Sequence, residues 1–357
     1  MAKIDNILLK TKFRGSMLGS LVGDCLGGPF EGDEFTHGII NTVQKCFDKL
    51  DGPYFKSPYR SYSDDTVMTK GTAQTLIDKP AVDYKYMAQL YVQEYFKEPK
   101  RGYGHNVVET FKKLKHTNFV DIYLPAKEQF NGTGSFGNGG AMRISPIALY
   151  FHNNYAGMVE AAKKSTEITH THLLGINGAL LQCIAVHQSL QADPKVSLDV
   201  YKFLADLDEK MKQIEDRNVP SRNSDEDPFP YKTQLQMIKQ LLQADKPDDP
   251  IRIEEIIGVL GNTVNALYSV PTAIYCFLKA HTGFPEVKCD NIFRRAIQYA
   301  CAMGGDTDTI ASMAGAITGA YYGEEIISEN LVKHCEDHKD ILKLADQLFD
   351  ASQAHTG

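Results

Sequence analysis

Apolar side chains recur every three to four residues through most of this 357-residue chain, which is the spacing of one helix face. The chain shows no βαβ rhythm, no hairpin signal and no internal repeat. We therefore expect an all-α fold: a single compact orthogonal helix bundle in one domain over residues 1–357, with its core at about 12–352. The pattern predicts helices over residues 12–28, 67–77, 83–97, 107–114, 155–168, 172–190, 196–214, 231–242, 250–267, 271–280, 291–303, 309–323 and 340–349.

Two stretches lack sustained helical periodicity. Residues Thr36–Tyr62 are rich in Gly, Pro and aromatic side chains, and we interpret them as an ordered loop. Residues Asp216–Pro230 are polar and contain Pro, which is typical of a linker.

Two of the predicted helices carry small residues four positions apart. Glycines at this spacing lower helix propensity but let another backbone approach closely. We expect these helices to pack together at the centre of the fold, which would bring Asp24 and Glu31 towards residues 306–309. The alternative is that each helix is buried independently. The small residues are Gly15, Gly19, Gly23 and Gly27 in the first helix, and Ala311, Gly315, Gly319 and Gly323 in the second.

Hydroxyl and carboxylate side chains stand directly before two helices, at residues 304–309 (Gly-Gly-Asp-Thr-Asp-Thr) and 63–66 (Ser-Asp-Asp-Thr). The glycine pair permits a tight turn, and hard oxygen ligands on such a turn are what Mg²⁺ or Mn²⁺ favours. The alternative is helix capping, because Asp, Ser and Thr are good N-caps. Since two coincident caps explain the pattern less well, we expect the clusters to face each other around two metal ions, with Asp308 as the bridging carboxylate.

Residues 132–140 form a glycine-rich stretch, Gly-Thr-Gly-Ser-Phe-Gly-Asn-Gly-Gly. It is not a P-loop, because the Lys-Ser/Thr pair is missing. We expect consecutive N–H groups here, and a helix starting near Ala141, to suit a phosphate. Phe136 could stack on a base or close over a sugar, whereas Arg143 is expected on the surface or in packing. The alternative is a mere tight connection.

A further stretch, Thr169-His170-Thr171-His172, has two histidines two positions apart. We do not interpret them as a zinc site, since no Cys or third His lies at a ligand spacing. One of them is expected either to form hydrogen bonds in a pocket or to be a structural histidine.

Composition narrows the class of protein. A net charge of −7 and a pI near 5.9 argue against a general binder of nucleic acid or anionic membranes. The seven cysteines are scattered without a CxxC pair, and Met1–Asn6 is too short and polar for a signal peptide. We expect a soluble intracellular protein with reduced thiols.

Several of these motifs together resemble one known family, the ADP-ribosylglycohydrolases, which are related to dinitrogenase reductase-activating glycohydrolase. The resemblance runs from about Phe13 to Tyr322. Residues 130–132 and 269–275 also resemble one vertebrate branch of the family. The motifs that carry the family resemblance are residues 13–15, 23–25, 63–66, 134–143 and 304–309.

This resemblance implies an all-α hydrolase with two Mg²⁺ ions, for which Mn²⁺ could substitute. The enzyme would cleave the 1″ bond of serine-linked ADP-ribose, of poly(ADP-ribose) and of O-acetyl-ADP-ribose. Glu31 would be catalytic and help to activate water. The implied metal ligands are Glu31, Ser63, Asp64, Asp65, Asp306, Asp308 and Thr309. The implied substrate contacts are Thr133, Gly134, Ser135, Phe136, Gly137, Asn138, Gly139, His170 and Val264.

The resemblance also implies a setting: a monomer that acts on ADP-ribosylated proteins after DNA damage, in the cytoplasm and nucleus and also in the mitochondrial matrix. No direct contact with nucleic acid or membrane is implied. Ser63 stands where the human protein of the branch has Thr, and Phe136 where it has Tyr. Three alternatives stay open: a catalytically silent ADP-ribose reader, a hydrolase of arginine-linked ADP-ribose, and a two-metal phosphohydrolase that attacks the pyrophosphate.

Overall fold

The computed structural model describes residues 5–53, 59–216, 227–246 and 248–355, and this part of the chain is helical without a β-strand. The all-α prediction is therefore confirmed. The helices are α1 (Asn6–Gly27), α2 (His37–Asp51), α3 (Asp64–Asp78), α4 (Tyr84–Lys97), α5 (His105–His116), α6 (Leu124–Lys127), α7 (Gln129–Gly132), α8 (Ser145–Tyr150), α9 (Tyr155–Glu167), α10 (Leu173–Leu190), α11 (Val200–Glu215), α12 (Pro230–Ala244), α13 (Ile253–Leu260), α14 (Val270–Lys279), α15 (Ile292–Ala302), α16 (Thr307–Tyr322), α17 (Glu329–Lys333) and α18 (His338–His355).

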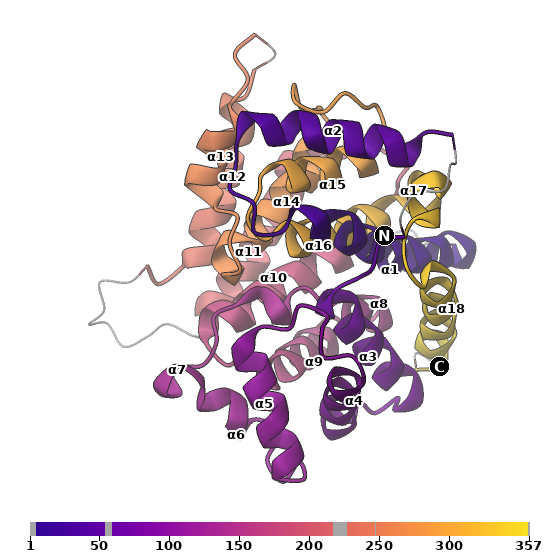
Figure 1. The fold of residues 1–357 in the computed structure, drawn as a ribbon, viewed down its shortest axis with the longest axis vertical. Helices are drawn as coiled ribbons and strands as arrows, with labels where there is room; N and C mark the ends of the chain where they lie inside the picture. The colour runs from indigo at the N-terminus through magenta and orange to yellow at the C-terminus, as the bar shows by residue number, and fades with distance from the viewer. Residues whose placement is uncertain (1–4, 54–58, 217–226, 247, 356–357) are drawn as a thin grey trace.

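The most extensive helix–helix contact joins α1 and α16, from opposite ends of the chain, near the centre of the molecule (Figure 1). Their small residues face each other, and a Cβ on Gly19 or Gly23 would overlap the backbone of α16. Ser20 Oγ lies 2.8 Å from Ser312 Oγ across the same contact, which satisfies both buried hydroxyls. The predicted central pair of glycine-striped helices is confirmed.

Other helices enclose this pair. Helices α10, α14, α15 and α18 contact α1 or α16. By length and composition alone α10 could cross a membrane, but 78% of it is buried inside the fold, as in a core helix of a soluble protein. A smaller apolar cluster lies where α3, α4 and α5 meet, centred on Met87, Tyr91 and Phe111.

Three expectations about elements were wrong. The stretch interpreted as a loop contains α2, whose buried Ile39, Val43, Phe47 and Leu50 fall at helical spacing; residues 54–58 of that stretch lie outside the described residues. The helix predicted over 250–267 stops at Leu260, because Gly261 adopts a φ of +81°. No helix starts at Ala141, since the chain turns there and α8 begins only at Ser145. Of the predicted linker, residues 217–226 also lie outside the described residues.

The tight α1–α16 contact predicts that a single methyl group is harmful there. Gly319→Ala places its Cβ on the backbone of Gly15, so the free energy of unfolding should fall by about 1–3 kcal/mol, the usual cost of overpacking. Urea unfolding followed by circular dichroism measures it. Gly258→Ala is the control, because that helical glycine faces open space, and alanine there should stabilise by roughly 0.5–1 kcal/mol. Equal effects of the two substitutions would refute the close-contact argument.

Candidate functional site

The two acidic turns and the glycine-rich loop line one cavity of about 420 Å³, which we call the acidic cavity. Its acidic wall comes from three segments that are distant in sequence. These are the loop after the short 3-10 turn Gly28–Phe30, the start of α3 and the start of α16. The predicted site residues that line it are Glu31, Asp64, Asp65, Ser135, Phe136, Gly137, Asn138, Gly139, His170, Val264, Asp306, Asp308 and Thr309.

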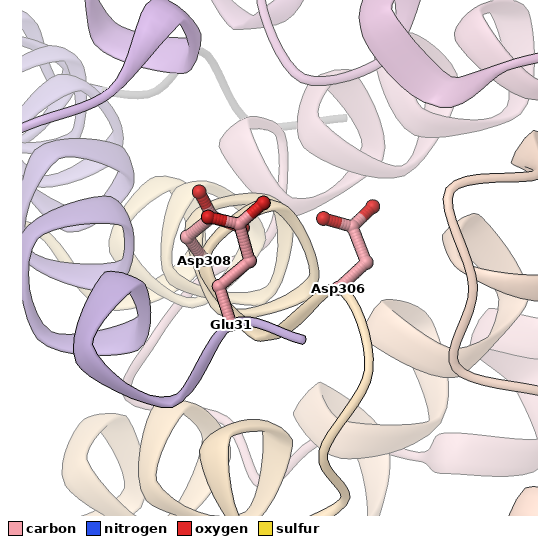
Figure 2. Close-up of side chains that lie close together, drawn as sticks. All are labelled: Glu31, Asp306 and Asp308. Carbon is pink, nitrogen blue, oxygen red and sulfur yellow. The ribbon is translucent and has the colours of Figure 1, made fainter. Parts of the chain in front are cut away.

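Three carboxylates in this cavity converge closely enough to share one cation. One oxygen of each of Glu31, Asp306 and Asp308 lies within 4.8 Å of the other two. Figure 2 shows the three side chains pointing towards one another. Asp306 and Asp308 are buried, whereas Glu31 is exposed at the edge of the group. A set of hard carboxylate oxygens of this kind suits a divalent cation such as Mg²⁺.

Backbone hydrogen bonds hold Glu31 beside the α16 turn. Gly32 N donates to Gly305 O (2.8 Å), and Gly305 N donates to Asp33 O (2.9 Å). Gly304 and Gly305 have φ values of +69° and +72°, a conformation that favours glycine. The glycine pair therefore serves the tight turn that the sequence predicts.

Asp24, at the end of α1, fixes the second acidic turn. Its buried carboxylate accepts hydrogen bonds from Ser63 N (2.9 Å), Thr66 N (3.1 Å) and Thr66 Oγ1 (2.6 Å). Ser63 Oγ in turn accepts from Asp65 N (3.2 Å) and caps α3, and Ser63 does not line the acidic cavity. Asp24 thus organises the turn, and the role of Ser63 as a metal ligand stays a prediction.

One buried carboxylate oxygen in the cavity has no protein partner. Asp65 Oδ1 accepts from Thr309 Oγ1 (3.3 Å), but Asp65 Oδ2 is buried and receives no hydrogen bond from the residues that the structure describes. A buried acceptor without a donor is rare in native proteins. A cation beside Asp65 would satisfy it, so the donors of both turns fit a metal ion.

The proximity of these acids perturbs their titration. Burial, and then the charges of Asp306 and other neighbouring acids, raises the pKa of Asp308 to about 9. Burial, and then the Asp24 charge, raises the pKa of Asp64 to about 8. The pKa values of Glu31, Asp65 and Asp306 are also raised, mainly by burial. Like charges in a low-dielectric site cannot all ionise without a counter-charge, which a bound cation would supply.

The glycine-rich loop lies directly against His170, because a Cβ on Gly139 would overlap the imidazole ring. Burial, and then the charge of Arg143, lowers the pKa of His170 to about 3, so its ring is neutral at physiological pH. Thr169 Oγ1 lies 2.7 Å from His170 Nδ1 and orients the ring. The sequence left open a histidine in a pocket or a structural histidine, and His170 is a neutral residue that lines the acidic cavity. Neither His170 nor His172 belongs to the carboxylate group of Glu31, Asp306 and Asp308.

Several loop amides are already occupied, so the expected run of free N–H groups is only partly present. Those of Thr133, Gly134, Gly137 and Asn138 donate within the protein. Across the described chain, the amides of Ser135 and Phe136 have no protein acceptor. These two N–H groups are available for a phosphate contact.

Two aromatic rings flank the loop at the mouth of the cavity. The centroids of Phe130 and Phe136 lie 5.7 Å apart with planes tilted by 32°. Phe136 also lines a neighbouring cavity of about 740 Å³, which contains Thr133. Neither Thr133 nor Gly134 lines the acidic cavity, and a Cβ on Gly134 would overlap the side chain of Thr171. Val264 is 64% exposed at the rim.

Some residues that shape the site were not assigned a role from the sequence. Asn262 O accepts from Asp306 N (2.8 Å), which fixes the start of α16. The Asn138 side-chain amide, predicted to contact substrate, donates to Asp306 Oδ2 and to Ser269 Oγ. For Asn262 the one clue in the sequence is that it follows Gly261, because a Gly-Asn pair commonly marks the end of a helix. Arg143 is buried and bonded to Ser165 O and Thr169 Oγ1, which agrees with packing.

Comparison with known proteins identifies the family. A family model described as ADP-ribosylglycohydrolase matches residues 5–357, so the chain belongs to the ADP-ribosylglycohydrolase family. It is 40% identical to ADP-ribosylhydrolase ARH3 of Gallus gallus over 357 residues, which cover 95% of this chain and 93% of that protein. Against ADP-ribosylhydrolase ARH3 of Homo sapiens the identity is 38% over 346 residues, with coverage of 95% and 93%.

The fold itself recurs in a solved structure described as an ADP-ribosylglycohydrolase-related protein complex. The TM-score is 0.67 at 18% sequence identity, and the match covers 96% of this chain and 99% of that one. The family resemblance and fold class predicted from the sequence are confirmed. Family and relatives together support a glycohydrolase that acts on ADP-ribosylated substrates.

The raised pKa of Asp308 predicts how pH affects stability without metal. Between about pH 4 and 9 the native carboxyl holds a proton that the unfolded chain releases, so the free energy of unfolding falls as pH rises. Asp308→Asn removes this cost. In EDTA its Tm should exceed that of the wild type, by a margin that grows from about pH 6 to about pH 8.5.

Differential scanning calorimetry measures both Tm values. The control is Asp350→Asn, which changes an exposed carboxyl on α18 and should not alter Tm over this range. A margin that is absent, or that shrinks as pH rises, would contradict the argument from burial.

Proposed function

We propose that this protein is a Mg²⁺-dependent ADP-ribosylhydrolase that cleaves the 1″ O-glycosidic bond of serine-linked ADP-ribose, and also acts on poly(ADP-ribose) and O-acetyl-ADP-ribose. The observation that carries the proposal is the convergence of two carboxylate turns beside a glycine-rich loop in one cavity. The similarity to relatives named ADP-ribosylhydrolase ARH3 supports the substrate class.

Two cations, Mg²⁺ or in its place Mn²⁺, would be held by the two acidic turns. Glu31, Asp306 and Asp308 suit one ion, because their oxygens already converge. Asp64 and Asp65, together with Thr309 and a shared Asp308, suit the other, which would satisfy the unpartnered Asp65 oxygen. When bound, such ions polarise substrate oxygens and lower the pKa of coordinated water.

Glu31 is the proposed catalytic residue. It is the most accessible member of its carboxylate group, but its carboxyl lies partly inside the cavity. This partial burial, and then the charges of Asp306 and Asp24, raise its pKa above the usual range for glutamic acid. A carboxylate with a raised pKa is a better general base. As the C1″–O bond breaks and water attacks C1″, Glu31 takes a proton from that water. Glu31 then gives this proton to the departing serine oxygen and returns to the carboxylate form. The products are ADP-ribose and the free serine hydroxyl.

The rest of the substrate would lie along the glycine-rich loop. The free amides of Ser135 and Phe136 would donate to the pyrophosphate. The adenine would stack on the Phe130–Phe136 pair at the mouth, since both rings are partly exposed there. The neutral His170 would contact the substrate without adding charge.

The stacking role predicts an effect on substrate binding. Phe136→Ala should raise KM roughly tenfold, the effect of losing one stacked base, with little change in kcat because the proposed stack contacts the adenine and not the ribosyl C1″ atom. Steady-state kinetics on an ADP-ribosylated peptide measures both constants. Phe96→Ala, which removes a similarly exposed ring on α4, is the control and should change neither. A fall in kcat at constant KM would argue against stacking.

The linkage and the metal can be tested together. Peptides ADP-ribosylated on serine or on arginine are incubated with the protein, in Mg²⁺ or in EDTA, and the products are separated by chromatography. We expect ADP-ribose from the serine peptide alone, no release in EDTA, and at least about a hundredfold loss in Asp308→Asn, as for a lost metal ligand.

Each other outcome has a distinct meaning. Equal release from the arginine peptide would refute the serine preference, and release that EDTA leaves unchanged would refute the metal. AMP as the product would identify a pyrophosphohydrolase. Binding of ADP-ribose without any release would identify a silent reader.

A further inference from the structure

The segment before the second acidic turn, residues 63–66 at the start of α3 (the α3 turn), is attached to a distant part of the chain. Residues 59–62 precede Ser63 and lie along residues 334–337, which connect α17 to α18. Arg60 N donates to His334 O (2.8 Å), and Glu336 N donates to Arg60 O (2.9 Å). The C-terminal part of the chain thus contacts the entrance to the α3 turn, although none of it lines the acidic cavity.

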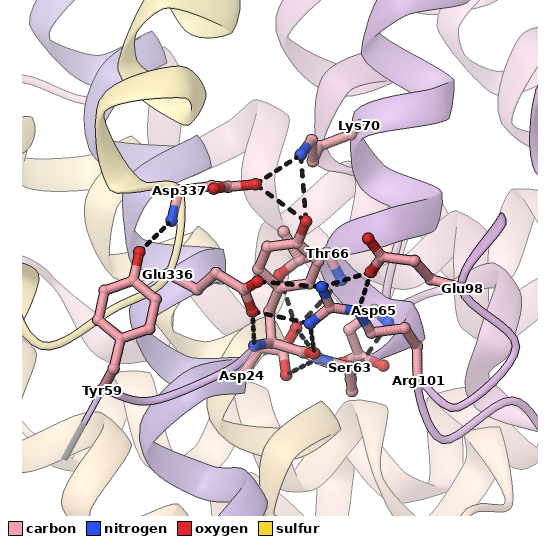
Figure 3. Close-up of polar contacts among 11 residues, drawn as sticks. Asp24, Tyr59, Ser63, Asp65, Thr66, Lys70, Glu98, Arg101, Glu336 and Asp337 are labelled. Carbon is pink, nitrogen blue, oxygen red and sulfur yellow. Dashed lines mark hydrogen bonds and ion pairs between the residues drawn. The ribbon is translucent and has the colours of Figure 1, made fainter. Parts of the chain in front are cut away.

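Arg101 fastens the same turn from both sides of Ser63. Its carbonyl oxygen accepts from Asp64 N (2.6 Å), and its guanidinium donates to Tyr62 O (3.0 Å). The guanidinium also binds Glu336 in a two-pronged pair at 2.7 and 3.0 Å (Figure 3). Both charged groups are largely buried, with 14% and 19% of their side chains exposed. Planar paired contacts of this kind fix orientation as well as distance.

Further contacts complete the attachment, among them one between Lys70 and Asp337 (Figure 3). Glu336 Oε2 accepts from Tyr62 N (3.3 Å), and the Tyr62 hydroxyl donates to Asp337 Oδ2 (3.0 Å). Lys70 on α3 donates to the same Asp337 oxygen (3.1 Å). The Arg101 guanidinium carbon lies 4.3 Å above the centre of the Tyr62 ring. Tyr62 is therefore held through its backbone, its ring and its hydroxyl, one residue before the turn.

We infer that Arg101 and Glu336 are positioning residues that hold the α3 turn in the geometry needed to bind a cation. The inference rests on the proposed function, which makes Asp64 and Asp65 ligands. Groups that orient metal ligands from behind usually contribute about 10–100-fold to metal affinity. A pair that only stabilised the fold would lower Tm and leave the affinity of the folded protein unchanged.

Arg14 offers a matched control. Its guanidinium forms an equivalent two-pronged pair with Asp346 (2.7 and 2.8 Å) and a third bond to Glu324 (2.9 Å). These contacts tie α1 to α18 and to the turn after α16, away from the acidic cavity. Arg14→Gln should therefore destabilise the protein without changing its affinity for metal.

The experiment titrates the full-length protein with Mn²⁺ and follows free Mn²⁺ by electron paramagnetic resonance, so that no activity is needed. Arg101→Gln and Glu336→Gln should each raise the Kd at least about tenfold. Arg101→Lys keeps the positive charge but not the planar guanidinium, so its Kd for Mn²⁺ should lie between those of the wild type and Arg101→Gln. The double variant Arg101→Gln/Glu336→Gln should bind Mn²⁺ about as weakly as Arg101→Gln alone, because the Arg101–Glu336 pair is already lost in that single variant.

Calorimetry on the same samples gives Tm. If Arg101→Gln and Glu336→Gln lower Tm but bind Mn²⁺ as tightly as Arg14→Gln and the wild type, the inference is overturned and the proposed function stands. If the wild type itself does not bind Mn²⁺, the metal centre is refuted and the inference falls with it. The isosteric Glu336→Gln is the milder variant and decides the question should Arg101→Gln fail to fold.

Discussion

The close contact of two glycine faces is the constraint on which the site depends. Helices α1 and α16 approach so closely that a Cβ on Gly27 would lie 2.6 Å from the Cα of Asp308. The end of one helix and the start of the other are therefore fixed to each other by backbone, without side chains between them. Thr307 Oγ1 donates to Gly27 O (3.0 Å) at the same point. Because Glu31 follows the first helix and Asp308 opens the second, the carboxylates meet where the helices do.

The second consequence concerns charge. Burying several carboxylates in one cavity opposes folding unless something compensates. The chain compensates the buried charge differently for each acidic residue. Asp24 receives backbone and hydroxyl donors, and Asp306 receives the amide of Asn138. Asp65 keeps one oxygen without a donor, and Asp308 retains a raised pKa. The negative charge that no protein donor offsets is thus concentrated on carboxylates that face the acidic cavity. Within the described part of the chain, this cavity is where the protein is complementary to a cation.

The sequence predicted the parts of the site that repeat a local pattern. Glycines at intervals of four and the acidic turns before α3 and α16 each carry their own signal within a few residues. Helix α2 was missed because it shares the stretch 36–62 with Gly-, Pro- and aromatic-rich residues that follow it, and the whole stretch was interpreted together. The link between Arg101 and Glu336 spans 235 residues, and the occupation of loop amides depends on partners such as Val264 O. Contacts of this kind follow from tertiary packing and leave no local trace.

The order in which the chain is made gives the central contact one more consequence. Helix α1 is synthesised first, but the α16 residue that bonds to Gly27 lies 280 residues later. At usual translation speeds that interval lasts roughly 15–60 s. Throughout it the glycine face of α1 has no native partner, and a glycine-rich helix alone in water is only marginally stable. The first helix of the nascent chain therefore stays loose, or shielded by a chaperone, until α16, which begins at Thr307, has left the ribosome.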